Sequence, residues 1–175
     1  MKSQNRFVFS LSNEGHLQKA FDSRCWAFPV WKAQNESLIA KAMQNINAGD
    51  RCFFFVTQQA LRREYSDEPR YFDLPAIVAK APRECSLELS PVFGSGFQLQ
   101  FEITPCLNRL RSVILPAAKR AHKLPSSWIA LLHAQPRQVC LPVTNDGIPI
   151  FDAIWNSLVR GELFIEKRVH PKYLK

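Results

Sequence analysis

One short run of residues constrains the fold of this chain more than any other feature. From Cys52 to Thr57 the sequence reads CFFFVT, which is apolar without interruption until the closing threonine. A strand with one face in water alternates apolar and polar residues, whereas an unbroken apolar strand has to be buried. The run also follows Gly49-Asp50 directly, which is a turn signal. We therefore predict a strand at the centre of a sheet.

Apolar patterns divide the rest of the chain into short elements. Further strands are expected at Arg6–Leu11, Leu74–Lys80, Phe97–Thr104 and Gln138–Val143. Helices are expected at Leu17–Phe21, from Asn35 to a stop at Gly49, at Ala117–Lys123, at Ser127–His133, and at Phe151–Val159 with a stop at Gly161. The segments 58–71 and 81–96 are predicted to be an exposed loop and an irregular stretch, and Pro29 interrupts the pattern after Trp26. Without regular βαβ alternation, this order favours an α+β fold whose sheet can curl into a small barrel.

The predicted second helix carries a continuous apolar stripe. Its members are Leu38, Ile39, Met43 and Ile46. They recur at helical spacing, so they share one face. We predict that this face packs against the strand at Cys52–Thr57. Trp128 and Trp155 lie on the apolar faces of later helices and are predicted to be core.

Length and hydropathy favour one soluble domain over residues 1–175, ending in a basic tail at 166–175. A chain of 175 residues can bury a substantial core but is short for two domains. No apolar run approaches the roughly 20 residues that span a bilayer. The first residues, MKSQNRFVFSLSNEGH, lack the apolar segment of a secretion signal. We therefore expect a cytoplasmic protein without a membrane partner.

The positive charge is concentrated in one part of the chain. The net charge is +8, and no Asp or Glu occurs between Ile103 and Asn145. The basic residues of this stretch that we expect to contact phosphates are Arg109, Arg111, Lys119, Arg120 and Arg137. A solvated basic surface that only aids solubility is the alternative. An acid-free stretch sustains a positive potential, which favours DNA or RNA as the partner.

The motifs of common catalytic and metal sites are missing from the sequence. The five cysteines are Cys25, Cys52, Cys85, Cys106 and Cys140, and none forms a C-x-x-C pair. Neither a disulfide framework nor a metal site is predicted from such spacing, and the four histidines are equally scattered. A phosphate-cradling glycine loop and a G-x-S-x-G elbow are also missing. We expect no cofactor, no metal and no catalytic activity in this chain.

The order of elements resembles the YTH and EVE families of the PUA-like superfamily. The resemblance starts with FVFSLSNEGHLQKAFDSRCWAFP and INAGDRCFFFVT, and continues through FDLPAIVAKAPRE, FQLQFEITPCLNRL and TNDGIPI. It spans roughly residues 6–160. The resemblance implies an α+β, PUA-like curved sheet or small barrel flanked by helices. It also implies a pocket that takes one flipped, commonly methylated base out of a strand.

The same resemblance suggests which residues hold the base. Trp26 matches the first cage tryptophan of the family, and Asn13 matches the polar residue that contacts the base. Trp31 and Asn35 lie in the connecting segment and are further candidates. The second cage wall of the family comes from an irregular loop, where this chain has Phe93 but no tryptophan. Core packing is the alternative for both Trp26 and Trp31.

Three functions follow from these patterns and remain open at this point. The first is a reader of a modified base in DNA or RNA, acting alone or with a separate nuclease or NTPase subunit in defence, restriction or regulation. The second is a PUA-like component of an RNA-modification or RNA-processing enzyme. The third is a protein-interaction domain with an incidental basic surface. The sequence favours the reader, because it shows a basic stretch and lacks a catalytic constellation.

Overall fold

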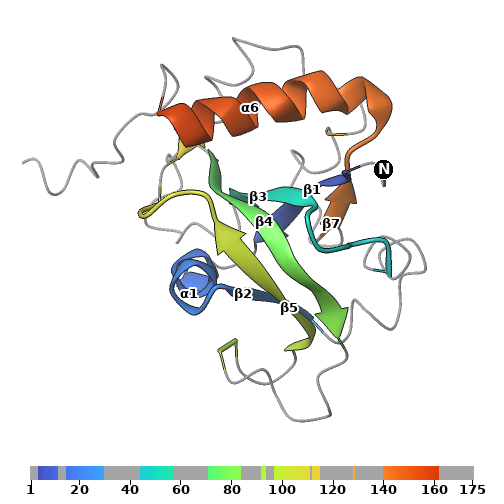
Figure 1. Cartoon of the computed structure of the whole chain (residues 1–175). Helices are drawn as coiled ribbons and strands as arrows, with labels where there is room; N and C mark the ends of the chain where they lie inside the picture. The colour runs from blue at the N-terminus through green and yellow to red at the C-terminus, as the bar shows by residue number, and fades with distance from the viewer. Residues whose placement is uncertain are drawn as a thin grey trace, which may run out of the picture.

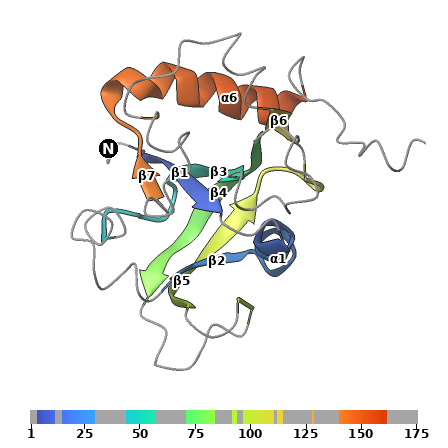
Figure 2. The same cartoon turned by 180° about the vertical axis from the view of Figure 1, so that it is seen from behind.

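A curled sheet lies between one long helix and one short helix (Figure 1). The computed structural model describes residues 4–11, 15–29, 44–56, 71–83, 92–93, 97–110, 112–114, 128 and 140–161. The strands are β1 (Arg6–Leu11), β2 (Cys25–Pro29), β3 (Arg51–Val56), β4 (Tyr71–Arg83), β5 (Phe97–Pro105), β6 (Val113–Ile114) and β7 (Cys140–Pro142). The helices are α1 (Gly15–Ser23), the short 3-10 turn η2 (Asn145–Gly147) and α6 (Ile148–Arg160). Seen from behind, in Figure 2, α6 and α1 again lie on opposite sides of the sheet.

The strand order places β3 in the interior of the sheet, as predicted. The order is β2-β5-β4-β3-β1-β7, and β6 pairs with β4 outside this path. β3 runs parallel to β1 and antiparallel to β4. The remaining pairs are antiparallel. The mixed sheet and its curl agree with the expected α+β fold.

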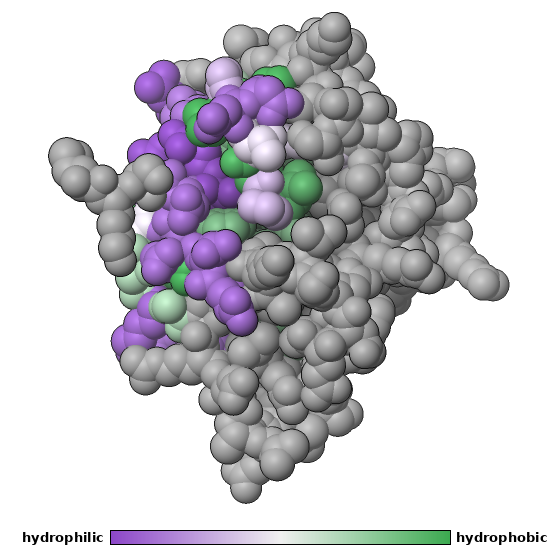
Figure 3. Space-filling view, turned by 90° about the vertical axis from the view of Figure 1, so that its right-hand side faces the viewer, coloured by the Kyte–Doolittle hydropathy of each residue, from purple (hydrophilic) through white to green (hydrophobic). Residues whose placement is uncertain are grey.

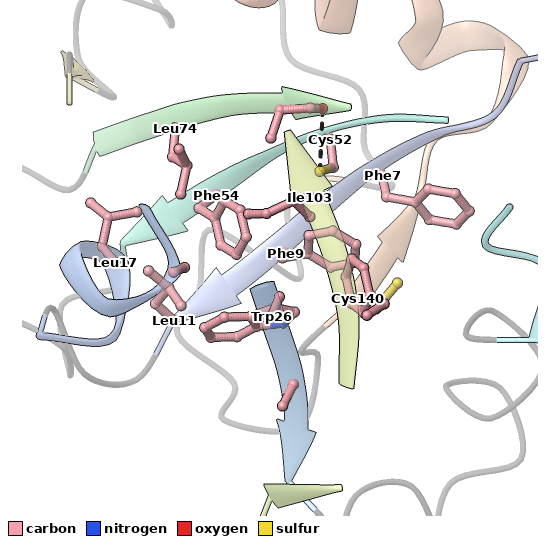
Figure 4. Close-up of a cluster of buried hydrophobic side chains, with 14 of the residues drawn as sticks. Phe7, Phe9, Leu11, Leu17, Trp26, Cys52, Phe54, Leu74, Ile103 and Cys140 are labelled. Atoms are coloured by element: carbon pink, nitrogen blue, oxygen red, sulfur yellow. Dashed lines mark hydrogen bonds between the residues drawn. The ribbon is translucent and has the colours of Figure 1, made fainter. Parts of the chain in front are cut away.

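β3 is buried on both faces, and its side chains alternate between two cores. Cys52, Phe54 and Val56 belong to one cluster, which also holds Phe9 from β1. Figure 4 shows this first cluster among the strands of the curled sheet, with Leu17 of α1 at one end. The neighbouring residues Phe53 and Phe55 point to the other face, into a second cluster. An unbroken apolar strand therefore requires cover on both sides, which the curl of the sheet and α6 provide.

α6 covers the second face with a stripe of buried side chains. The stripe consists of Phe151, Ile154, Trp155 and Leu158. The helix begins with a proline in its first turn and ends at Gly161, which takes a left-handed φ of 72°. Trp128 and Trp155 are both buried in this cluster, so the prediction that they are core is confirmed.

An ion pair fixes α6 to the start of the sheet. Arg6 Nε and Nη2 each donate to a different oxygen of the Asp152 carboxylate, at 2.9 Å and 2.9 Å. Arg51, the register partner of Arg6, lies over the Trp155 ring at 5.5 Å from its centroid. A two-pronged arginine–carboxylate pair restricts orientation as well as distance. The helix is thus held in one position along the strands.

The turn before β3 is organised by a buried carboxylate. Asp50 is 3% exposed, and its oxygens accept the backbone N–H groups of Asn5 at 2.9 Å and Asn47 at 2.8 Å. Gly49 takes a φ of 93° here, and its N–H donates to Val78 O at 2.8 Å. The prediction that the second helix runs to Gly49 is wrong: the helix ends at Gln44, and the left-handed Gly49 belongs to the turn that leads into β3. Asp50 therefore joins the start of β1 to the turn that sets the register of β3.

The sequence prediction was wrong at three strand boundaries. The residues around Trp26 form β2, although Pro29 indicated an irregular segment. Pro29 ends an edge strand, where its missing N–H is tolerated. β4 begins at Tyr71 and continues to Arg83, so it includes ends that were predicted as loop. Strand β7 ends at Pro142, one residue before the predicted Val143, while the predicted start at Gln138 lies outside the described residues.

Other predicted elements lie outside the described residues. They are most of the second helix, the loop 58–70, nearly all of the two helices between 117 and 133, and the basic tail. Ile46 is the stripe residue that is described, and it is buried in the cluster of Cys52 and Phe54. Leu38, Ile39 and Met43 stay predictions. None of the described helices is long and apolar enough to span a membrane.

We expect Asp50→Ala to lower the free energy of unfolding by about 2–4 kcal/mol, because two backbone N–H groups lose a charged acceptor. The exposed Asp22 accepts a single side-chain hydrogen bond, from Gln18 at 2.8 Å. Asp22→Ala is therefore the matched control and should change stability by less than about 0.5 kcal/mol. Urea denaturation measures both. Equal midpoints for the two variants would contradict the role of Asp50.

Candidate nucleic-acid interface

Trp26 is positioned by a sharp change of direction between α1 and β2. Arg24, directly after α1, takes a left-handed φ of 54°, which ends the helix. Its carbonyl then accepts the Ile103 N–H at 2.9 Å, which starts pairing with β5. Trp26 lies opposite Phe101 in this pairing, and a bulge follows it. The indole is thereby directed into the first core cluster, beside α1 (Figure 4).

Trp26 packs against aromatic rings from two different parts of the chain. Its ring lies 5.1 Å from Phe54 at an interplanar angle of 77°. It also lies 5.1 Å from Phe93 at 75°. The imidazole ring of His16, from α1, in turn contacts the ring of Phe93, at 5.6 Å between centroids and an interplanar angle of 88°. We call Trp26, Phe54, Phe93 and His16 the Trp26 cluster.

Trp26 is a core residue in this structure. It is 3% exposed, and Leu17 and Ala20 of α1 are buried in the same cluster. Core packing, the alternative that the sequence left open for Trp26, is therefore what the structure shows. The turn at Arg24 and the pairing of β2 with β5 cause this burial. Whether Trp26 also binds a base stays a prediction.

The indole N–H of Trp26 is a buried donor. Among the described residues, no acceptor lies within hydrogen-bond distance of its Nε1. An unpaired buried donor costs about 1–3 kcal/mol, so it favours any acceptor that can reach it. Trp128 Nε1, in the second cluster, is likewise buried without a hydrogen-bond acceptor among the described residues. Its site differs, because Gly147 leaves room for the ring: a Cβ at this glycine would lie 3.0 Å from Nε1.

His16 is the ionisable residue of the Trp26 cluster. It is half-buried in the first turn of α1. Burial lowers the pKa of His16 below 6.5, and the nearby charge of Lys19 lowers it further. The imidazole is therefore neutral at pH 7, which suits its edge-to-face contact with Phe93. A neutral imidazole offers one donor and one acceptor.

The predicted base-binding residues are described only in part. Trp26 and Phe93 lie far apart in sequence, and the fold brings them into contact. Asn13, Trp31 and Asn35 lie outside the described residues. The sequence prediction missed His16 as a member of the site. The position of His16 in the sequence, between Asn13 and Trp26, is the signal that could have suggested it as a site residue. Its contact with Phe93 joins distant segments and is not visible in the sequence.

The predicted phosphate-contacting residues are described at one position. Arg109 is exposed just after β5, the strand that pairs with the Trp26 strand. The others, Arg111, Lys119, Arg120 and Arg137, lie outside the described residues. The basic face therefore stays a prediction.

The described cysteines are poorly suited to nucleophilic chemistry. Cys25, Cys52 and Cys140 are buried free thiols, and Cys106 is half-buried. Burial raises the pKa of Cys52 and of Cys140, and to a lesser extent that of Cys106. Thiols with raised pKa values hold little thiolate at neutral pH. Within the described residues, no group of three His, Cys, Asp or Glu side chains could hold a metal ion.

A different side of the molecule is hydrophilic. Figure 3 shows the side on which β7 and the start of β1 lie, and purple predominates among its described residues. Exposed side chains of this region include Gln4, Asn45, Asn47, Asn145 and Asp146. Several of their polar groups are used locally: Gln4 Nε2 donates to Gly49 O and Asn47 Nδ2 donates to Asn45 O.

The comparisons with known proteins identify the fold. The sequence matches no protein-family model, and no curated protein matches it in sequence. A YTH domain, that of Zygosaccharomyces rouxii MRB1 in complex with N6-methyladenosine RNA, is similar in structure, with a TM-score of 0.57 over 90% of this chain and 88% of that one at 14% identity. The chain has the fold of a YTH domain. The curved sheet flanked by helices that the resemblance implied is confirmed.

Two further solved structures share this YTH-like fold. The Pho92 YTH domain in complex with m6A has a TM-score of 0.57 at 14% identity, over 93% of this chain and 87% of that one. Human THYN1 in complex with DNA that contains 5-methylcytosine has a TM-score of 0.52 at 13% identity, over 91% of this chain and the full 100% of that one. At such identities the likeness establishes the fold alone.

The lowered pKa of His16 predicts a stability effect below neutral pH. The unfolded chain takes up a proton near pH 6.5, whereas the folded chain keeps His16 neutral until a lower pH. The unfolded state then binds more protons, so the contribution of His16 to stability falls as the pH drops below 6.5. We expect His16→Gln to lose less stability than the wild type between pH 7 and about pH 5. Chemical denaturation at several pH values measures the difference.

Lys19→Gln provides a second comparison for this effect. Removing the nearby positive charge brings the folded-state pKa of His16 closer to its usual value, so the pH dependence should become shallower. Parallel curves for the wild type and His16→Gln would show that His16 is not perturbed in the folded state.

Proposed function

We propose that this chain is a nucleic-acid-binding module that holds one flipped, modified base against Trp26. The observation that carries the proposal is the contact of Trp26 with Phe93 at 75° in a YTH-like fold. Stacking of a base on an aromatic side chain contributes about 1–3 kcal/mol. A methyl group removed from water adds about 0.8 kcal/mol. An aromatic site can therefore distinguish a methylated base from its unmodified form.

The structural neighbours support a modified base as the ligand. The MRB1 and Pho92 YTH domains are bound to N6-methyladenosine RNA and m6A, and human THYN1 is bound to DNA with 5-methylcytosine. Both ligands carry a small methyl group on a planar base. We infer that this shared chemistry, a methylated base in DNA or RNA, is the ligand class of the present chain.

Polar and basic residues complete the proposed site. The amide side chains of Asn13 and Asn35 can read the edge of a base by paired hydrogen bonds, and Trp31 is a further candidate ring. Arg109, with Arg111, Lys119, Arg120 and Arg137, is proposed to contact phosphates. Phosphate contacts position the strand without reading its sequence. The base pocket and the basic residues would thus have separate roles.

The proposed module binds but does not catalyse. The raised pKa values of its buried thiols disfavour a cysteine nucleophile. Any cleavage of the bound nucleic acid would come from a separate nuclease or NTPase subunit. The module would then supply only the recognition of the modified base.

Trp26→Leu tests the proposed base site. Leucine keeps an apolar side chain in the core but removes the aromatic face. We expect the affinity for an oligonucleotide with one methylated base to fall by about 1–3 kcal/mol. Trp155→Leu is the matched control. The two tryptophans are similarly buried, at 6% exposed for Trp155 and 3% for Trp26, but Trp155 lies in the second cluster, under α6. Its binding affinity should stay unchanged when both variants are titrated below their melting temperatures.

The two variants also separate binding from folding. Both should lose stability, because both truncate a buried tryptophan. A Trp26→Leu protein that binds as well as Trp155→Leu would exclude Trp26 from the binding site.

Charge reversal tests the proposed basic face. We expect Arg109→Glu, Arg111→Glu and Arg120→Glu together to weaken binding to modified and unmodified oligonucleotides alike, and to flatten the dependence of affinity on salt. The single variant Arg109→Glu is also compared with Arg160→Glu, which reverses the charge of an exposed arginine at the end of α6. We expect Arg160→Glu to leave the salt dependence of the affinity unchanged. Titrations at two salt concentrations measure the slope. An unchanged slope in the triple variant would remove these arginines from the interface.

A further inference from the structure

The burial of Trp26 sets a condition on any base that binds to it. A stacked base needs one open face of the indole, yet Trp26 is 3% exposed. Within the described residues, the rings of Phe54 and Phe93 lie against it. A base can reach the indole only if one of its neighbours moves away.

Phe54 is held too firmly to be that neighbour. It belongs to β3, between β1 and β4, and it also contacts the ring of Phe9 at 5.5 Å. Its main chain pairs with both adjacent strands, with Phe9 on one side and Asp73 on the other. Moving Phe54 would disrupt the centre of the sheet.

Phe93 is attached differently. It lies in a turn at Val92–Phe93, outside the strands of the sheet, in the connection between β4 and β5. It is nevertheless only 5% exposed, and its ring contacts both Trp26 and His16. A side chain on a turn can leave its place without breaking any strand pairing.

We propose that Phe93 fills the base-binding space against Trp26 in the ligand-free protein and that the target base displaces it. This inference rests on the proposed function, because it concerns the same site. The exchange replaces one planar aromatic ring by another, so the contacts of the indole are restored in the complex.

Displacement of Phe93 has a distinctive thermodynamic signature. The observed affinity is reduced by the fraction of molecules in which the site is open. That fraction is a property of the free protein, so it reduces the affinity for modified and unmodified bases by the same factor. Removing the phenyl ring should therefore tighten both interactions equally. A residue that contacts the methyl group would instead change the ratio of the two affinities.

Phe93→Ala is the direct test. Single-stranded oligonucleotides with one N6-methyladenine or one 5-methylcytosine, and their unmodified counterparts, are titrated against the wild type and the variant. For the modification that the protein recognises, we expect Phe93→Ala to raise the affinity for the modified oligonucleotide and for its unmodified counterpart by about tenfold each. The ratio of these two affinities should stay unchanged. Phe21→Ala is the matched control, since Phe21 is a partly buried phenylalanine of α1 at the edge of the same core. It should leave the affinity unchanged.

Two further variants keep the test decisive. His16→Ala removes the contact on the other side of Phe93 and should tighten binding in the same direction, by a smaller factor. Phe93→Leu keeps apolar volume at this position, and should tighten binding to an intermediate extent if Phe93→Ala is too unstable to measure. Melting curves of all variants report the folded fraction during titration.

The outcomes separate this inference from the proposed function. Weaker binding by Phe93→Ala with reduced discrimination would identify Phe93 as a fixed wall of the pocket and overturn its displacement, while the base site at Trp26 would stand. Unchanged affinity in both Phe93 variants would also overturn the displacement. Unchanged binding by Trp26→Leu would instead overturn the base site itself.

Discussion

The burial of β3 on both faces determines the rest of this structure. Phe53 and Phe55 project to one side of the strand, while Cys52 and Phe54 project to the other. Burying a large apolar side chain stabilises a fold by about 1.5–3 kcal/mol, so neither face can be left in water. One face is covered by α6. The other is covered by the curl of the sheet, which brings β2 and β5 round to enclose the first cluster.

The candidate site is a consequence of this first cluster. The enclosed space holds Phe9, Phe28 and Phe101 at its centre, with ring centroids 5.5–5.6 Å apart. Trp26 and Leu17 extend the same cluster to α1. The residue proposed to bind a base is therefore also a residue that stabilises the domain. If the proposal holds, base binding and stability share the same aromatic surface, and a change at Trp26 affects both.

The parts of the fold that were predictable from sequence are those with local causes. β1, β3 and α6 follow from apolar periodicity and from stop signals such as Gly161, which are visible within one segment. β2 was not predictable, because its extended form depends on pairing with β5. The contact of His16 with Phe93 was hidden for the same reason, since it joins segments far apart in the chain. Trp26 was found through its order after the first helix, but its burial was not.

The neighbours of Trp26 differ in whether they belong to the sheet, and this difference distinguishes a fixed residue of the fold from residues that could adapt to a ligand. Phe54 is fixed by two strand pairings, so it can change little between free and bound states. Phe93 and His16 lie outside the strands, on a turn and at the start of a short helix, so their displacement breaks no strand pairing. A site that joins one rigid ring to adaptable ones can keep its fold while its ligand preference changes. In a YTH-like fold with so little sequence in common with its neighbours, the sheet accounts for the shared architecture. The identity of the base would then depend on the residues that surround Trp26 from outside the sheet.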